Sequence, residues 1–325
     1  MPNVADFTYS AHLQRNTAGI VSFWTDDCCA FAAKCGDLEV LKNAHQSGCP
    51  WNESTCSYAA KGGYLDVLKY AHKNGCPWDE DTCTMAAIGG HLRVLKYAHQ
   101  QGCPWNEMTT FEAAQGGHLD MLKYLHENGC PWNEDCCSAA AQGGHLRVLR
   151  YAHKHGCPWD MRTTWIAARR GHIHSLKYAH ENGCPWDAAT CAGAARHGHL
   201  SVLKYARKQR CPWDERTCAA AAAGGHLKVL KYAYAKGCPW DQRTCLQAAQ
   251  GGHIHVLKYA YENGCPCDEH ACSVHAGSRR HKHVRAWLLG VRYHSLIKGM
   301  HQSSQRTLML RSGTFANRMK RTRGV

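Results

Sequence analysis

Cysteine and histidine are the side chains of this sequence that could do chemistry. Its 325 residues include 21 cysteines and 24 histidines, and these residue types bind zinc or combine as a nucleophilic thiol and its base. One set of cysteines precedes a proline and recurs at one constant interval, without insertion or deletion. Its members are Cys49, Cys76, Cys103, Cys130, Cys157, Cys184, Cys211, Cys238 and Cys265. A second set lies seven residues further on and has Thr110 and Thr164 in place of cysteine in two copies. Any zinc site or catalytic thiol must therefore be compatible with a unit that repeats along the chain.

The regular spacing argues against a metal site, a disulfide framework and a catalytic thiol. Zinc needs four converging ligands, whereas ligands supplied once per repeat cannot converge, and no C-x-x-C spacing occurs. Packed helices lie about 8–10 Å apart, which exceeds the roughly 7 Å limit on the Cα separation in a disulfide. The sequence also has no P-loop, no dinucleotide-binding glycine pattern and no HExxH. We therefore expect no enzymatic activity, no metal and no cofactor, with cysteine acting as a small buried hydrophobic residue in a reducing compartment.

The repeated unit has the pattern of two short helices. In residues 237–263, Asp241 stands at an N-cap position, and residues 242–250 carry one stripe of small apolar side chains. Gly251 and Gly252 follow and can end this helix in a left-handed cap. A second helix from His253 to about residue 262 would turn inward Ile254, Val256, Leu257 and Tyr259 or Ala260. Such short helices are marginal alone, so the pattern predicts an all-α solenoid of stacked helix–turn–helix repeats.

The unit resembles an ankyrin repeat. Its Gly-Cys-Pro-Trp-Asp/Asn stands where that family has Gly-Ala-Asp-Val-Asn, and residues 86–102, AAIGGHLRVLKYAHQQG, show the family's Ala-Ala-x-x-Gly-His-Leu and second helix most plainly. The repeat has 27 residues against about 33 in the family, and the missing ones fall where the family has its β-hairpin finger. The resemblance implies reduced or absent fingers and a non-enzymatic protein–protein interaction scaffold. Short Cys-Pro-Trp repeats are similar to those of ankyrin families in giant DNA viruses and some protists.

The repeats divide the chain into four parts. A lead over residues 1–21 precedes nine repeats over 22–264, a degenerate capping repeat occupies 265–290, and a basic tail that we expect to be mostly disordered occupies 291–325. Residues 276–325 carry twelve of the 14 net positive charges and no Asp or Glu. In an alternative function, Lys320, Arg321 and Arg323 of this tail contact nucleic acid or act as a nuclear address. The other interpretation of the tail is a solvated extension that has no function.

The sequence also carries predictions about location and assembly. No apolar run is long enough for a membrane span, and the start lacks the pattern of a secretory signal. We therefore expect an intracellular protein in the cytoplasm or nucleus, of a host cell if the protein is viral. Nothing in the sequence indicates an oligomer, so we expect a monomer.

The surface that varies between repeats is the predicted binding site. If the second-set cysteine points inward, the positions two before it and one, two and five after it lie on the opposite side of the first helix. In a stacked array that side is concave, and solenoids bind partners there. Exposed aromatic, Met and Arg side chains are enriched at interfaces. The predicted partner-binding residues are Tyr58, Met85, Ile88, Met108, Phe111, Glu112, Arg162, Trp165, Ile166, Arg169 and Leu246. The same stripe contains Arg196, Arg216 and Arg243.

Two alternatives concern the aromatic residues. Phe111 and Trp165 directly follow Thr110 and Thr164, so they could instead fill gaps left where threonine replaces cysteine. The histidine of the recurring Gly-Gly-His and the tryptophan of Cys-Pro-Trp are interpreted as packing between repeats. In that interpretation the imidazole bonds to backbone and the indole seals neighbouring repeats together, rather than forming a zinc site or a ligand cage.

Overall fold

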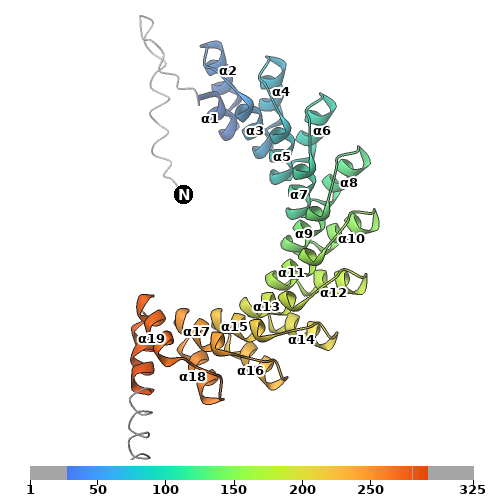
Figure 1. Cartoon of the computed structure of the whole chain (residues 1–325). Coiled ribbons are helices and arrows are strands. Elements are labelled where there is room, and N and C mark those ends of the chain that lie inside the picture. The colour runs from blue at the N-terminus through green and yellow to red at the C-terminus, as the bar shows by residue number, and fades with distance from the viewer. Residues whose placement is uncertain (1–27, 280, 292–325) are drawn as a thin grey trace, which may run out of the picture. The chain divides into compact units, whose positions relative to one another are not determined.

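Paired helices make up the computed structural model, which describes residues 28–279 and 281–291 (Figure 1). The first helices of the pairs are α1 (Cys28–Cys35), α3 (Glu53–Gly62), α5 (Glu80–Gly89), α7 (Glu107–Gln115), α9 (Glu134–Gly143), α11 (Met161–Arg170), α13 (Ala188–Arg196), α15 (Glu215–Ala223), α17 (Gln242–Gln250) and α19 (Glu269–Ser278). The second helices are α2 (Leu38–Gln46), α4 (Leu65–Lys73), α6 (Leu92–Gln100), α8 (Leu119–Glu127), α10 (Leu146–Lys154), α12 (Ile173–Glu181), α14 (Leu200–Lys208), α16 (Leu227–Ala235) and α18 (Ile254–Glu262). Residues 282–291 are also helical. The predicted all-α array of helix–turn–helix repeats is confirmed, and no strand occurs within these ranges.

Two compact units make up the chain, and they divide between Cys136 and Cys137 within α9. In the first unit, α1, α3, α5 and α7 pack side by side, and α2, α4 and α6 form a second layer against them. In the second unit, α11, α13, α15, α17 and α19 pack in the same way, with α10, α12 and α14 among the second helices (Figure 1). Over the ranges described, no helix combines the length and the apolar character that crossing a membrane requires.

The caps of the helices follow from local sequence. The Asp241 side chain accepts a hydrogen bond of 3.0 Å from the backbone N–H of Arg243 and so caps α17. Gly252 follows with a φ of +74°, a left-handed conformation that glycine adopts without a Cβ clash. Both features lie where the sequence predicted them. The second helix α18 begins at Ile254, one residue later than expected, because His253 is its N-cap residue.

The core of each repeat combines small side chains on the first helix with larger ones on the second. In α17 the buried side chains are Cys245, Ala248 and Ala249 with Thr244, and in α18 they are Val256, Leu257 and Ala260. Ile254 and Tyr259 are partly buried and pack against this core. A fully buried leucine contributes about 1.5–3 kcal/mol relative to an exposed one. Leu257 recurs as a fully buried leucine in successive repeats, so this position supplies much of the bulk.

The predicted capping repeat, residues 265–290, keeps more of the pattern than its sequence suggested. It lacks the Gly-Gly-His-Leu motif, but the His281 ring still donates from Nε2 to the carbonyl of Gln250 at 3.1 Å. Val284 and Leu288 of the helical segment 282–291 are buried in the core of the second unit. The equivalent histidine was missed because it stands one position later in the sequence than the interval between the preceding repeats predicts.

Candidate functional site

The tryptophan of each Cys-Pro-Trp loop is part of an aromatic stack between repeats. In the first unit, Trp78 stacks on His72 with 3.7 Å between ring centroids and meets Tyr97 of the next repeat edge-on at 6.4 Å. In the second unit, Trp186 makes the same contacts with His180 at 3.7 Å and Tyr205 at 6.3 Å. These indoles therefore join one repeat to the next and are not free to line a ligand cage.

The stack tolerates replacement of its histidine. In one repeat the Arg207 guanidinium carbon lies 4.0 Å from the ring centroid of Trp213, a cation–π contact in place of the imidazole. In the next, Tyr234 stacks on Trp240 at 4.0 Å. Where histidine is present, burial lowers the pKa of His72. Both replacements keep a flat group on the indole face, so this position is fixed by packing.

The histidine that starts the second helix holds neighbouring repeats together through the backbone. His172 Nε2 donates to the carbonyl of Gln142 at 3.1 Å, and His199 Nε2 donates to that of Arg169 at the same distance. A Cβ on Gly144, whose φ is +74°, would come within 2.6 Å of the His172 ring, which explains why glycine precedes this contact. Burial lowers the pKa of His199, so the neutral imidazole is favoured.

Seven cysteines of the Cys-Pro set donate their thiol hydrogen to a backbone carbonyl of the previous repeat. Cys103 Sγ lies 3.2 Å from the carbonyl oxygen of Asp79, and Cys184 Sγ lies 3.2 Å from that of Asp160. Burial raises the pKa of the Cys184 thiol to about 12. A thiol that is bonded to backbone and keeps its proton at neutral pH is a poor nucleophile, so this ladder belongs to the fold.

Threonine replaces cysteine in the second set because both side chains can donate to backbone. Thr110 Oγ1 can donate to the carbonyl of Pro131 at 2.9 Å or to that of Glu107 at 2.8 Å, and Thr164 Oγ1 to that of Pro185 at 2.7 Å or of Met161 at 3.0 Å. Both threonines are fully buried, and each takes the site that Cys29 occupies when its Sγ meets the Cys49 carbonyl at 3.6 Å. Both threonines are therefore bonded to backbone, as Cys29 of the second set is.

The predicted binding surface takes four positions from the first helix of each repeat, but not all four are exposed. The position directly after the cysteine is buried at Ser57, Thr84 and Ser138, and Thr84 Oγ1 lies 3.2 Å from Thr109 Oγ1 of the next repeat. In these three copies the position faces the neighbouring first helix, which corrects the expectation that it lies on the open surface there. Where the side chain is larger, at Phe111, Trp165 and Leu246, it stays partly exposed.

The predicted binding residues differ in how they are placed. Three of those in the first unit are exposed, namely Tyr58, Ile88 and Met108. The partly buried ones there are Met85, Phe111 and Glu112, and burial raises the pKa of Glu112. In the second unit Arg162 and Arg169 are exposed, whereas Trp165, Ile166 and Leu246 are partly buried. Lys320, Arg321 and Arg323 of the tail lie outside the described residues.

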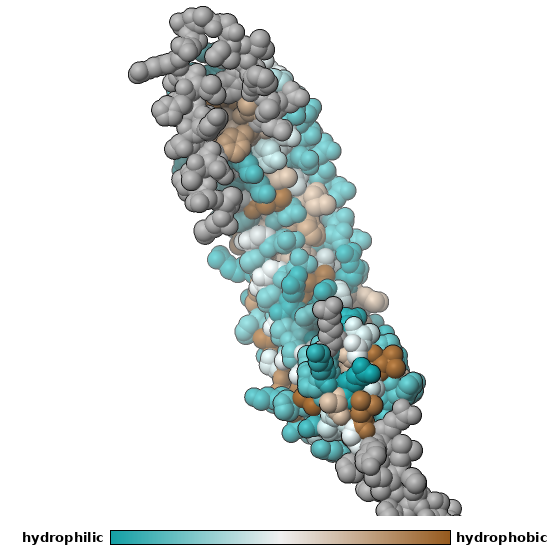
Figure 2. Space-filling model, turned by 90° about the vertical axis from the view of Figure 1, so that its left-hand side faces the viewer, coloured by the Kyte–Doolittle hydropathy of each residue, from teal (hydrophilic) through white to brown (hydrophobic). Residues whose placement is uncertain are grey.

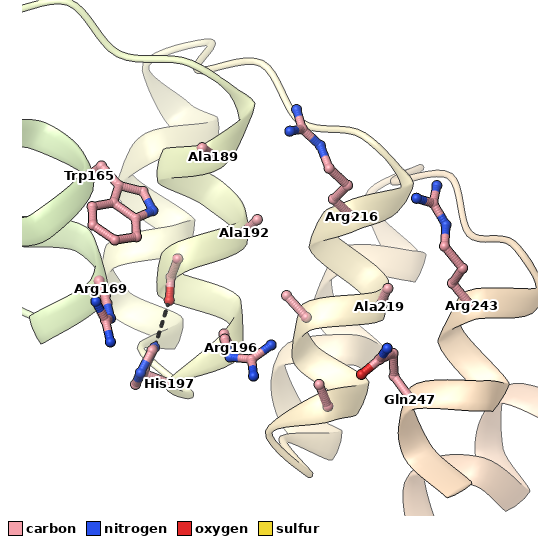
Figure 3. Close-up of a pocket in the computed structure, with 13 residues that line it drawn as sticks. Trp165, Arg169, Ala189, Ala192, Arg196, His197, Arg216, Ala219, Arg243 and Gln247 are labelled. Atoms are coloured by element: carbon pink, nitrogen blue, oxygen red, sulfur yellow. Dashed lines mark hydrogen bonds between the residues drawn. The ribbon is translucent and has the colours of Figure 1, made fainter. Parts of the chain in front are cut away.

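A groove of about 570 Å³ crosses the first helices of the second unit (Figure 3). Its floor is formed by small residues, namely Ala189, Ala192, Gly193, Ala219, Ala220 and Ala223. Trp165 of α11 and Gln247 of α17 also line it. A Cβ on Gly193 would lie 3.2 Å from Trp165 Nε1, so the indole packs over this glycine. The absence of a side chain at Gly193 therefore gives room for the ring.

Arginines stand on both rims of the groove (Figure 3). Arg216 and Arg243 lie in the first turns of α15 and α17, and Arg169 and Arg196 lie in the last turns of α11 and α13. His197 follows Arg196, and its Nδ1 is 3.2 Å from the carbonyl oxygen of Gly193. No Asp or Glu is among the lining residues. A hollow lined by one sign of charge concentrates ions of the opposite sign, so this groove favours anionic groups.

The two rims differ in their ion pairs. Arg216 Nε donates to Asp214 at 2.8 Å and Arg243 Nε donates to Asp241 at 2.7 Å, while Arg243 Nη2 also reaches Glu215 at 2.9 Å. The contact with Arg216 holds the pKa of the Asp214 carboxyl below its usual range.

The opposite rim carries the unpaired charge. The Arg169 guanidinium carbon lies 5.2 Å from the Trp165 ring centroid. No carboxylate of the described residues forms a salt bridge with Arg169 or Arg196, and both side chains are exposed.

Sequence reasoning placed Arg196, Arg216 and Arg243 in the variable stripe but did not select them. The available signal was their spacing, because Arg169 and Arg196, and likewise Arg216 and Arg243, are separated by one repeat and thus occupy equivalent positions. The small residues that form the floor of the groove could not be recognised from the sequence, since alanine is common in the buried part of every first helix.

The face turned to the viewer in Figure 2 shows hydrophobic side chains in small separate groups among hydrophilic ones. Such scattered apolar groups are ordinary on a protein surface. Within the described residues, no group of three or more His, Cys, Asp or Glu side chains is arranged to hold a metal ion.

The fold defines a helical repeat protein whose shared positions join repeats and whose variable positions lie on the first helices. No protein-family model and no curated protein matches the sequence. Among solved structures, the chain is similar to the ankyrin repeat domain of human ASB11, with a TM-score of 0.43 and 18% sequence identity, over 48% of this chain and 84% of that chain.

Proposed function

We propose that this chain is a non-enzymatic scaffold that binds a protein partner on the exposed surface of its first helices. The proposal rests on the different roles of the recurring and the variable positions within the repeat. The recurring Cys, His, Trp and Tyr side chains bond or stack from one repeat to the next, as for Trp78 and His172. The exposed positions of the first helices instead differ between repeats, from Met108 to Arg169.

Side chains of the interface-forming types support this choice of surface. Tyr58, Ile88 and Met108 are large and exposed. Aromatic, Met and Arg residues supply much of the binding energy at protein interfaces. The groove beside Trp165 adds a concave site of the size that binds ligand-sized groups.

Affinity capture with surface variants tests the proposal. The tagged chain is compared with a Phe111→Ala, Trp165→Ala double variant and with Arg147→Ala, an exposed residue of the second helix α10. We expect the double variant to lose partners that the Arg147 variant retains, while both keep the circular dichroism of the parent chain. If the double variant retains every partner at unchanged stability, first-helix binding through these residues is wrong.

A further inference from the structure

We infer that the arginine-rimmed groove of the second unit binds an acidic peptide segment of the partner protein, through carboxylates on its arginines and an aliphatic side chain on its alanine floor. This inference rests on the proposed function and adds the chemistry of the ligand. It follows from the charge of the rims, the size of the floor residues and the contacts that already occupy some of the arginines.

The rim formed by Arg169 and Arg196 supplies the binding charge. Both arginines are exposed, and within the described chain neither forms a salt bridge with a carboxylate. The guanidinium of Arg169 lies against the Trp165 ring, which restricts its motion and so reduces the entropy lost on binding. A guanidinium presents parallel N–H groups that match the two oxygens of a carboxylate. Glutamate or aspartate side chains of a peptide would meet this rim directly.

The opposite rim limits how much negative charge the groove accepts. Asp214, Glu215 and Asp241 already hold Arg216 and Arg243, and their side chains are 29%, 41% and 35% exposed respectively. These carboxylates repel a densely charged polyanion. An acidic peptide can place its few carboxylates on the Arg169 and Arg196 rim and keep neutral groups at the other.

The floor favours an aliphatic side chain from the ligand. Ala189, Ala192 and Gly193 present almost no side-chain volume, and Trp165 forms an apolar wall beside them. Burying an aliphatic group there stabilises the complex by about 25 cal/mol for each Å² removed from water. Trp165 is the only Trp, Tyr or Phe among the residues that line the groove, whereas binding of single-stranded nucleic acid relies on successive aromatic platforms.

The basic tail of this chain does not suit the groove. Residues 276–325 contain twelve Lys or Arg and no Asp or Glu, so the groove would repel them. The tail is therefore excluded as the occupant, and the inference places the acidic segment on the partner protein.

Fluorescence anisotropy of the full chain with a labelled peptide tests the inference. The probe is a short fluorescein-labelled peptide in which glutamates alternate with leucine and alanine, and its control has glutamine at every glutamate. The double variant Arg169→Ala, Arg196→Ala removes the unpaired rim. Its matched control, Arg147→Ala with Lys228→Ala, removes the same charge from exposed positions on second helices. A third variant, Ala192→Phe, fills the floor without changing the charge.

We expect the glutamate peptide to bind, the glutamine peptide to bind at least tenfold more weakly, and the affinity to fall with salt. The rim variant should lose roughly tenfold for each arginine removed, the Ala192 variant should also lose about tenfold, and the control should change less than about threefold. Equal losses in the rim variant and its control, or no loss in the Ala192 variant, would mean diffuse attraction and would overturn the inference.

Two further outcomes separate the inference from the proposed function. If a single-stranded oligouridylate binds more tightly than the glutamate peptide and the rim variant weakens it, the groove is a nucleic-acid site and the peptide inference is wrong. If no peptide binds while the Phe111 and Trp165 variant still loses its captured partners, the scaffold proposal stands and only the acidic ligand is refuted.

Discussion

Replacing Trp159 by alanine should destabilise the second unit by about 2–3 kcal/mol. The partly buried Trp159 ring stacks on His153 with 3.8 Å between centroids and meets Tyr178 edge-on at 6.2 Å. Each aromatic pair contributes about 0.5–1.5 kcal/mol beyond area burial, so the two together give about 1–3 kcal/mol. The apolar surface lost with the ring adds to this, and the roughly 3–5 kcal/mol measured for fully buried large aromatics sets the upper limit.

Urea unfolding followed by circular dichroism measures this free energy, and hydrogen exchange locates the loss. Repeat arrays can unfold in parts, so faster exchange is expected first in α10 and α12, the helices that carry His153 and Tyr178. Trp159→Phe keeps a ring between them and should cost less than half as much. A Trp159→Ala variant whose unfolding free energy lies within about 0.5 kcal/mol of the parent, the range of ordinary surface substitutions, would refute the stacking argument.

Three other outcomes are expected. Acidification from about pH 7 to pH 5 should lower the melting temperature. Burial lowers the pKa of His99 in the folded chain, whereas a histidine of the unfolded chain has a pKa of about 6.5, so the unfolded chain takes up protons over this range that the folded chain does not. An unchanged melting temperature would contradict this. Gly90→Ala should cost at least about 1 kcal/mol more than Gly102→Ala, the cost of overpacking, since both glycines have a positive φ but a Cβ at Gly90 would lie 2.5 Å from a histidine ring and one at Gly102 meets nothing within 4 Å; equal unfolding midpoints would argue against the clash. Oxidised glutathione should join Cys267 and Cys272 before any other pair, because their sulfur atoms are 3.8 Å apart and Cys267 is partly exposed; peptide mapping that finds a different first disulfide would exclude this order.

The sequence by itself determined the helices and their ends. Asp241 as N-cap, the glycine pair and the small apolar stripe of residues 242–250 are local signals, and each acts over one or two turns of backbone. Their repetition at a constant interval then predicted the stacked array, because helices this short must bury their apolar faces against neighbours. The same repetition argued against a single catalytic site built from the Cys and His residues.

Only the tertiary structure decided which side chains meet between repeats. His153 and Tyr178 belong to successive repeats, and the two rings meet across the boundary beside Trp159. The sequence also could not show that Ser57 and Thr84 are buried while Tyr58 is exposed. The angle at which one first helix packs on the next decides which of its side chains are buried. The groove depends on this same geometry. Arg169 and Arg196 become one cationic rim only when the packed helices place their last turns side by side above a floor of small residues.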